Sequence, residues 1–345
     1  MTARVVVCCG SGGVGKTTVS AALALRLARE GQRVAVLTID PARRLADSLG
    51  IGTLGNQARR VPVEQVGETT GSLDAMMLDA KSTFDELVHR FSPDARTAER
   101  VLQNRYYQFA SSRLGGSHEY MAMERLLTLY REGPYDTIVL DTPPTRHALD
   151  FLRAPDRMSG LMDQGVLRWL VMPSTKGGWR ALEFGSEAAA KVLKRLLGTG
   201  TIGEIAEFFD AFRALGESMS ERSVEVKALL QDPATRFVLV SSPAPASRDE
   251  ALFFLKVLDE RKMPFGGFII NRVQPPPIHA LERAQLPTGD GLAPEAWDDV
   301  HTTLLDAHAE QLRSAATHAG AIRALRDAGP KGAPWSTDAN GLGAE

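Results

Sequence analysis

The residues most able to do chemistry form one short run near the start of the chain. The run reads Gly10-Ser11-Gly12-Gly13-Val14-Gly15-Lys16-Thr17. It satisfies the pattern G-x-x-x-x-G-K-S/T, in which glycines let successive backbone N–H groups converge on an anion. In such a loop the lysine reaches the β- and γ-phosphates of a nucleotide, and the following hydroxyl is placed to ligate Mg²⁺. We therefore predict a nucleotide site here, with Lys16 on the phosphates and Thr17 on the metal.

Two aspartates end apolar segments and supply the acidic groups that such a site needs. Asp141 ends the segment TIVLD, and Asp40 ends the segment RVAVLTID. Because open α/β sheets bind ligands beyond the carboxyl ends of their strands, both aspartates are expected at that edge. We interpret Asp141 as a Mg²⁺ ligand, direct or through water, and Asp40 as the group that positions or deprotonates the attacking water. The alternatives are a strand-terminal aspartate capping a turn and a turn at Asp40-Pro41.

The elements around the phosphate-loop pattern are those that its mechanism requires. An apolar strand is expected at 4–9, an amphipathic helix at 17–30 and a second buried strand at 33–39, which together make a βαβ unit. Similar patterns predict strands at 75–78, 136–140, 237–241 and 267–270, and helices at 82–91, 95–103, 118–131 and 247–262. Residues 294–327 are expected to form one long terminal helix or a helix pair. We predict an α/β fold with a mostly parallel central sheet flanked by helices.

Between these strands lies a long stretch with helical periodicity only. We divide the chain into a first part of the nucleotide-binding core (1–157), a helical insertion (158–231), the remainder of the core with terminal helices (232–328), and a loose tail (329–345). The insertion is rich in Met, Leu and Phe. These side chains either line an apolar groove for a client or pack the core of the inserted subdomain, and the sequence alone does not separate the two.

Composition excludes several classes of protein. The chain has 345 residues, of which 43% are hydrophobic, enough to bury a sizeable core. It contains no run of about 20 apolar residues and no signal-peptide pattern, so we expect a cytoplasmic protein. Its 40 basic and 42 acidic residues leave a net charge of −2, which argues against nucleic-acid binding by bulk charge. Cys8 and Cys9 are adjacent in an expected strand, so we interpret them as reduced core residues.

Three segments together resemble one family of dimeric ATPases. GSGGVGKTT at 10–18 is similar to the family's deviant phosphate loop, K-G-G-x-G-K-T-T. TIDPARRLADSLG at 38–50 resembles its first switch, and DTPPTRHALDFLRAP at 141–155 resembles its second switch. On these motifs the chain is identified as a member of the arsenite-pump and tail-anchored-protein-targeting ATPases, which have the P-loop NTPase fold. The bacterial branch, the anion-transporting ATPases, is the most similar.

The resemblance implies a role for each matching residue. Asp40 would be the catalytic carboxylate that orients water, acting with Lys16. Thr17 would ligate Mg²⁺, with Asp141 as the partner from the second switch. ATP and Mg²⁺ are the implied cofactors, and hydrolysis would drive a conformational change in a dimer that handles a protein or apolar client, such as a membrane protein.

Two further contacts to the nucleotide are implied. Thr18 would contact the α-phosphate. Asn271, after the segment GFII, matches the position that reads adenine, and an asparagine amide offers the donor and the acceptor that this base needs. The alternative for Asn271 is a turn residue at the end of a strand.

The chain departs from the family at Ser11, where relatives carry a signature lysine that reaches the partner subunit's phosphates. A homodimer would lack this charge in both sites. Either the chain forms a heterodimer with a lysine-bearing paralogue, or Arg43, Arg44 or Arg146 compensates within the chain. The cysteines that bind metalloid or zinc in relatives are missing, so we expect neither site.

Other functions share parts of this pattern. A nucleotide-gated scaffold with little turnover is the main alternative, because Ser11 removes an activating charge. A partitioning or positioning ATPase would need a basic patch or a membrane helix, against which the near-neutral charge and the Gly/Pro-containing tail argue. A small-molecule kinase would match the loop but not the paired switch segments. We predict a Mg²⁺-dependent ATPase.

Overall fold

A single sheet organises the part of the chain that the structure describes. The computed structural model describes residues 4–40, 44–62, 70–105, 107–108, 111, 117–143, 152–153, 218–219, 221–277, 286 and 294–329. The seven strands are β1 (Val5–Gly10), β2 (Arg33–Thr38), β3 (Arg59–Val61), β4 (Ser72–Met77), β5 (Thr137–Asp141), β6 (Thr235–Ser241) and β7 (Phe265–Ile270). Their order is β3-β4-β2-β5-β1-β6-β7, and all pairs are parallel except the edge pair β3–β4. The predicted α/β class is confirmed.

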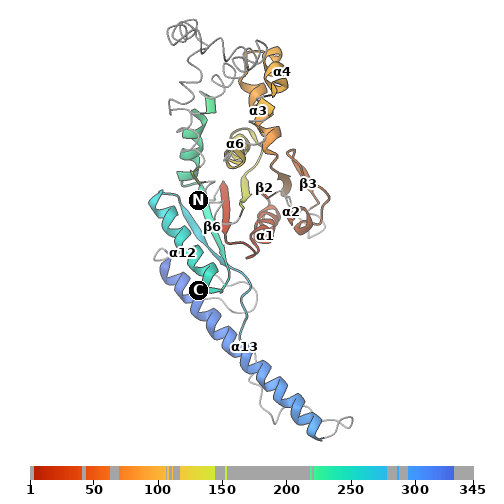
Figure 1. Cartoon of the computed structure of the whole chain (residues 1–345), viewed down its shortest axis with the longest axis vertical. Coiled ribbons are helices and arrows are strands. Elements are labelled where there is room, and N and C mark those ends of the chain that lie inside the picture. Colours follow the sequence, from red (N-terminus) through yellow and green to blue (C-terminus); the bar gives the residue numbers. More distant parts are fainter. Residues whose placement is uncertain are drawn as a thin grey trace, which may run out of the picture.

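Helices cover both faces of the sheet (Figure 1). Their bounds are α1 (Lys16–Arg29), α2 (Arg44–Ser48), α3 (Ala80–Phe91), α4 (Ala95–Gln103), α6 (Ser117–Glu132), α12 (Pro245–Glu260) and α13 (Pro294–Ala328). Alanines of α1 pack one face, whereas α3, α6 and α12 contribute larger side chains such as Leu126 and Phe254 to the other. Two-sided cover explains why the central strands are continuous apolar runs rather than alternating ones.

Strand β1 is buried along its whole length and lies between β5 and β6 in the interior of the sheet. Its side chains alternate, so that Cys8 packs on the α1 face and Cys9 on the opposite face. Both cysteines are free, and burial raises the pKa of each thiol to about 12. The prediction of reduced core cysteines is confirmed.

The register of the central strands brings their carboxyl ends together. Cys8 lies opposite Asp141 of β5, and Thr38 of β2 lies opposite the same aspartate on its other side. The loops that follow β1, β2 and β5 therefore leave the sheet at one edge, which is where doubly wound sheets bind ligands. The fold thus positions three sequence-distant segments around one point.

Two short elements were not predicted from the sequence. Strand β3 has three residues and pairs antiparallel at the edge, with Arg59 and Arg60 exposed, so it shows no apolar periodicity. Helix α2 has five residues and follows Asp40 closely. At the other end of the chain, α13 is one continuous helix that extends away from the sheet (Figure 1).

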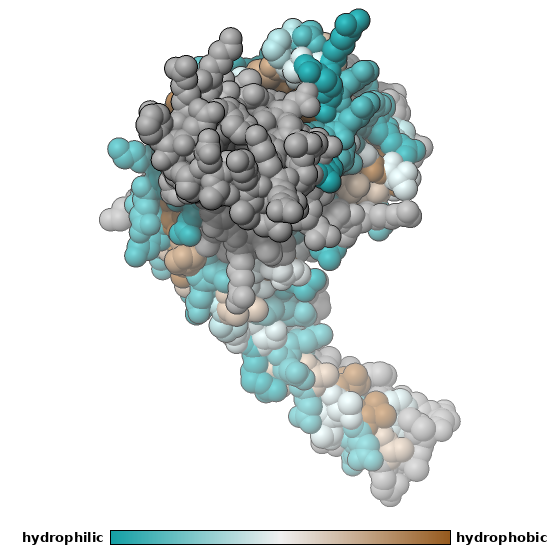
Figure 2. Space-filling model, turned by 45° about the horizontal axis from the view of Figure 1, so that its top comes forward, coloured by the Kyte–Doolittle hydropathy of each residue, from teal (hydrophilic) through white to brown (hydrophobic). Residues whose placement is uncertain are grey.

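The predicted insertion lies almost entirely outside the described residues. Within 158–231 the structure describes only 218–219 and 221–231, which are helical and lead into β6. The tail from 330 onward also lies outside, so the four-part division and the choice between groove and core stay predictions. On the face shown in Figure 2 the described residues are largely hydrophilic, with some apolar side chains on the extended helix α13. Leu304 and Leu312 are exposed residues of this helix. Among the described helices, none has the length and apolarity needed to cross a membrane.

Candidate nucleotide site

The loop between β1 and α1 has the backbone that a phosphate loop needs. Gly13 and Gly15 have φ of 77° and 91°, a left-handed conformation that other residues adopt at a cost. At Gly10 a Cβ atom would lie 2.0 Å from the carbonyl oxygen of Val240 in β6, so only glycine permits this close approach. The glycines of the motif thus let the chain curl tightly at the end of β1.

The loop delivers the chain directly into the amino-terminal end of α1. Gly15 is the N-cap residue, no side chain caps it, and the first turn contains no acidic residue. The uncapped N–H groups and the positive end of the helix dipole favour an anion at this point. Gly12, Gly13 and Thr18 are exposed around it, and Thr18 lies in the first turn, as its predicted role at a phosphate requires.

Lys16 is held inside the loop. Its ammonium Nζ donates to the carbonyl oxygen of Ser11 at 2.9 Å, and the residue is only 7% exposed. Burial lowers the pKa of Lys16, and the nearby Asp141 opposes that shift. A single carbonyl is a weak partner for a buried cation, and phosphate oxygens can replace it.

Asp141 is the buried centre of the site. Its carboxylate accepts hydrogen bonds from the hydroxyls of Thr17 (2.8 Å), Thr38 (3.0 Å) and Ser20 (3.3 Å). Burial raises the pKa of Asp141, whereas the hydrogen bond from Thr17 lowers it. Because the Thr17 hydroxyl donates a hydrogen bond to Asp141, the lone pairs of the Thr17 oxygen remain available to a cation. Hydroxyl and carboxylate oxygens are the donors that Mg²⁺ prefers, so this pair fits that ion, with Asp141 acting through Thr17 and water.

Asp40 lies at the same edge and is more accessible. Its backbone N–H donates to the Thr38 hydroxyl at 3.2 Å, and its carboxylate forms an ion pair with Arg44 at 2.9 Å. The Asp40 side chain is 21% exposed, which leaves it open to solvent. Thr38 therefore connects Asp40 to Asp141. Arg44 is the described member of the three arginines proposed to compensate for Ser11, and the other two lie outside the described residues.

Asn271 reaches the phosphate loop itself, a contact that the sequence did not predict. The residue follows β7, and its Nδ2 donates to the carbonyl oxygen of Val14 at 2.9 Å. Its Oδ1 accepts from the backbone N–H of Arg272 at 2.9 Å. The amide keeps a second N–H and a second lone pair, so it can still bind a base. The role of Asn271 on adenine stays a prediction.

Ser11 also has a partner that the sequence did not indicate. Ser11 is buried, and its hydroxyl lies 2.8 Å from the hydroxyl of Ser247. The sequence predicts that a helix starts at Ser247, but the helix α12 begins at Pro245, which places Ser247 inside its first turn. A serine near a helix start is the only signal that could have marked it, and such serines usually cap their own helix.

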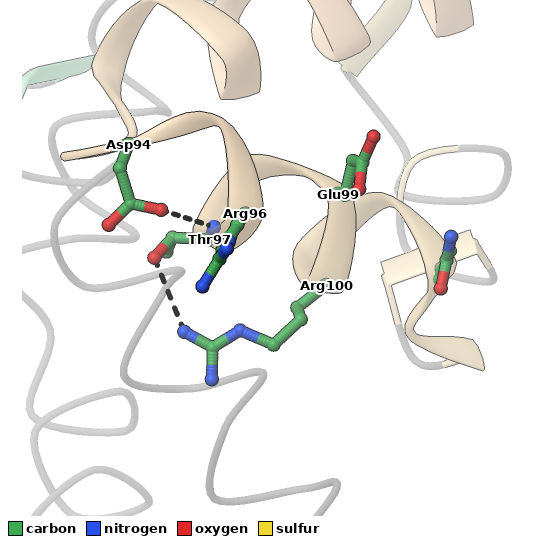
Figure 3. A pocket seen from close by; sticks show the side chains of 6 residues that line it. Asp94, Arg96, Thr97, Glu99 and Arg100 are labelled. Atoms are coloured by element: carbon green, nitrogen blue, oxygen red, sulfur yellow. Dashed lines mark hydrogen bonds between the residues drawn. The ribbon is translucent and has the colours of Figure 1, made fainter.

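A hollow lies along α4, away from the phosphate loop, and is lined by Asp94, Arg96, Thr97, Glu99, Arg100 and Gln103 (Figure 3). Asp94 caps the helix by accepting from the backbone N–H of Thr97 at 2.8 Å, and Arg100 donates to the Thr97 hydroxyl at 3.2 Å. These side chains come from a single helix and its N-cap, and their charges are mixed in sign. The hollow is a solvated helix face, and we assign it no role.

Gly15 offers a direct test of the loop. A Cβ atom there would lie 2.4 Å from Nδ2 of Asn271, and alanine is strained at a φ of 91°. We expect Gly15→Ala to weaken MgATP binding by at least about ten-fold, the equivalent of roughly 1.4 kcal/mol, because the added Cβ atom would push Asn271 and the phosphate loop out of the arrangement that receives the phosphates. Titration with a fluorescent ATP analogue measures the change. Gly31→Ala is the matched control, because Gly31 has the same φ at the opposite end of α1. Equal losses in both variants would contradict this role.

The chain is similar to known ATPases over most of its length. The family described as "Anion-transporting ATPase" matches residues 3–285, which include every residue of the candidate site. The "ATPase ASNA1 homolog" of Babesia bovis is 27% identical over 289 residues, which cover 84% of this chain and 69% of that protein. The "ATPase ASNA1 homolog 1" of Paramecium tetraurelia is 26% identical over 316 residues, 88% of this chain and 86% of that protein. The "ATPase GET3" of Mycosarcoma maydis is 30% identical over 232 residues, 67% of this chain and 60% of that protein.

Proposed function

The chain belongs to the anion-transporting ATPase family and is an ATP hydrolase, and on this premise we propose that its activity depends on Mg²⁺ and drives a conformational change in a dimer. The observation that carries the proposal is a hydrogen-bonded path across the sheet edge. It runs from Thr17 to the buried Asp141, on to the Thr38 hydroxyl, and from there to the backbone of Asp40. The path joins the phosphate loop to the segment after β2.

Each side chain in this arrangement has one proposed task. Lys16 leaves the Ser11 carbonyl and binds the β- and γ-phosphates, while Thr18 contacts the α-phosphate. Thr17 would hold Mg²⁺, and Asp141 orients the Thr17 hydroxyl for that role. Mg²⁺, when bound, supplies charge that offsets the charge developing on the phosphates. Asp40 orients the attacking water, and its partial exposure supports that task because water must reach it.

We propose that two chains meet through the face that carries the nucleotide. Movement of α2 with Asp40 would couple the state of the nucleotide to that interface, since Arg44 of α2 is paired with Asp40. The partner is either a second copy of this chain or a paralogue that carries the signature lysine. Residues 158–231 are proposed to bind the client, which is a protein or an apolar molecule.

The alternative is a nucleotide-gated scaffold with little turnover. The observation that favours it is the state of Ser11. This residue is uncharged, and its hydroxyl lies against Ser247 of its own chain. Such a residue supplies no positive charge to the phosphates of a partner.

The test is ATP hydrolysis by the purified chain, with and without Mg²⁺, together with its mass by light scattering in ATP and in ADP. Turnover that needs Mg²⁺, with a dimer in ATP, is the expected result. Tight ATP binding without turnover would favour the scaffold, and adding a lysine-bearing paralogue then asks whether a heterodimer restores activity. Absence of nucleotide binding would overturn both functions.

A further inference from the structure

We propose that Ser247 is a positioning residue for ATP binding, acting on the phosphate loop through Ser11; this rests on the proposed function. Ser247 comes from the first turn of α12, and its hydroxyl lies 2.8 Å from that of Ser11 across 236 positions of sequence. The carbonyl of the same Ser11 holds the ammonium of Lys16 at 2.9 Å. Ser247, which positions Ser11, therefore also positions Lys16 before it binds the phosphates.

The hydroxyl of Ser247 is held in place by its own surroundings. It accepts from the backbone N–H of Ser242 at 3.1 Å and lies 3.3 Å from the hydroxyl of Ser241. A serine hydroxyl has one donor and two acceptor sites, so these neighbours and Ser11 together satisfy it. Ser11 and Ser247 are both more than nine-tenths buried, which keeps water from replacing either partner. A satisfied buried network of this kind fixes geometry more than it adds stability.

The contact has a mechanical consequence. Ser11 occupies the position of the signature lysine. Its side chain contacts Ser247 of α12 in the same chain and does not extend toward a partner. The phosphate loop and the first turn of α12 are therefore expected to move together when ATP binds. Because α12 also packs on β6 and β7, the tie joins the loop to the half of the sheet that carries Asn271.

A double-mutant cycle of Ser11→Ala and Ser247→Ala in the full chain tests this inference. Each single variant is expected to raise the KM for MgATP about five-fold, the loss of one buried hydrogen bond, with kcat changed by less than about two-fold. The double variant should match the single variants, because both remove the same contact. The dissociation constant of a fluorescent ADP analogue should follow the KM values.

The control is Thr137→Val, which also removes a buried hydroxyl, one that donates to Oε1 of Gln32 at 2.7 Å at the end of β5 opposite Asp141. It should lower the melting temperature as Ser247→Ala does and leave the KM unchanged. The inference would be overturned if the effects of Ser11→Ala and Ser247→Ala on the KM multiplied in the double variant. It would also be overturned if Ser247→Ala lowered the melting temperature but left the KM unchanged. A wild-type chain that neither binds nor hydrolyses ATP would instead overturn the proposed function, so the two failures are distinguishable.

Discussion

Replacement of Asp40 by asparagine is expected to lower kcat for ATP hydrolysis by about 10³-fold, the size of effect that removal of a positioned general base gives. The KM for MgATP should change little, because Asp40 does not belong to the phosphate loop. The substitution keeps the shape of the side chain and leaves the backbone hydrogen bond from Asp40 to Thr38 in place. It removes the charge that faces Arg44 and the ability to accept a proton from water.

The matched control for Asp40→Asn is Asp136→Asn. Asp136 also pairs with an arginine, Arg33, at 2.7 Å. It immediately precedes β5 and so lies at the opposite end of that strand from Asp141. Steady-state assays at saturating ATP should show wild-type turnover for this control. Retention of turnover by Asp40→Asn would remove Asp40 from the mechanism. Arg44→Ala tests whether Arg44 compensates for the missing signature lysine at Ser11. A fall in kcat comparable to that of Asp40→Asn would make Arg44 the compensating cation.

The parts of the site that the sequence predicted are those with a local pattern. Lys16 and Thr17 belong to a motif whose glycines, strand and helix are all contiguous, so the physics that places them acts over a few residues. Asp40 and Asp141 were placed at one edge because each ends an apolar strand, and parallel strands share that edge. The register found for β2 and β5 confirms the placement, with Thr38 directly opposite Asp141.

The parts that the sequence did not predict depend on contacts between distant segments. Ser247 meets Ser11 only because β1 and β6 are neighbours, and no residue near either serine announces the pairing. The bond from Asn271 to Val14 has the same cause, since β7 follows β6 in the sheet. The resemblance to a family assigned Asn271 to the base. The structure adds a hydrogen bond from Asn271 to the carbonyl oxygen of Val14, so the residue predicted to read adenine also contacts the loop predicted to hold the phosphates.

Local signals also failed where the elements are short. Strand β3 holds its place through backbone pairing with β4 and through Arg60, which lies 2.6 Å from Asp74. Neither feature produces apolar alternation in the sequence. The first-switch segment was recognised by its motif, whereas α2 within it was not, because five residues are too few to show a helical period.

Lys16→Met is expected to have the second of the two largest effects, a fall in kcat of about 10²- to 10³-fold together with weaker MgATP binding. Methionine keeps an unbranched apolar stem in the buried loop and removes the charge. Because burial lowers the pKa of Lys16, the ammonium is held there at an energetic cost, and phosphates are the groups that repay it. The variant should therefore be at least as stable as the wild type without nucleotide, while it loses the stabilisation that ATP confers.

Thermal melts with and without MgATP, combined with turnover, separate this outcome from a folding defect. The control is Lys81→Met, in which the lost lysine is paired with Asp85 at 2.5 Å on α3, outside the nucleotide site. That control should keep both turnover and the shift of melting temperature caused by ATP. A Lys16→Met chain that still gains stability from MgATP would mean that the ammonium does not bind the phosphates. The loop backbone and the end of α1 would then carry nucleotide binding alone, and Lys16 would serve only to close the loop over Ser11.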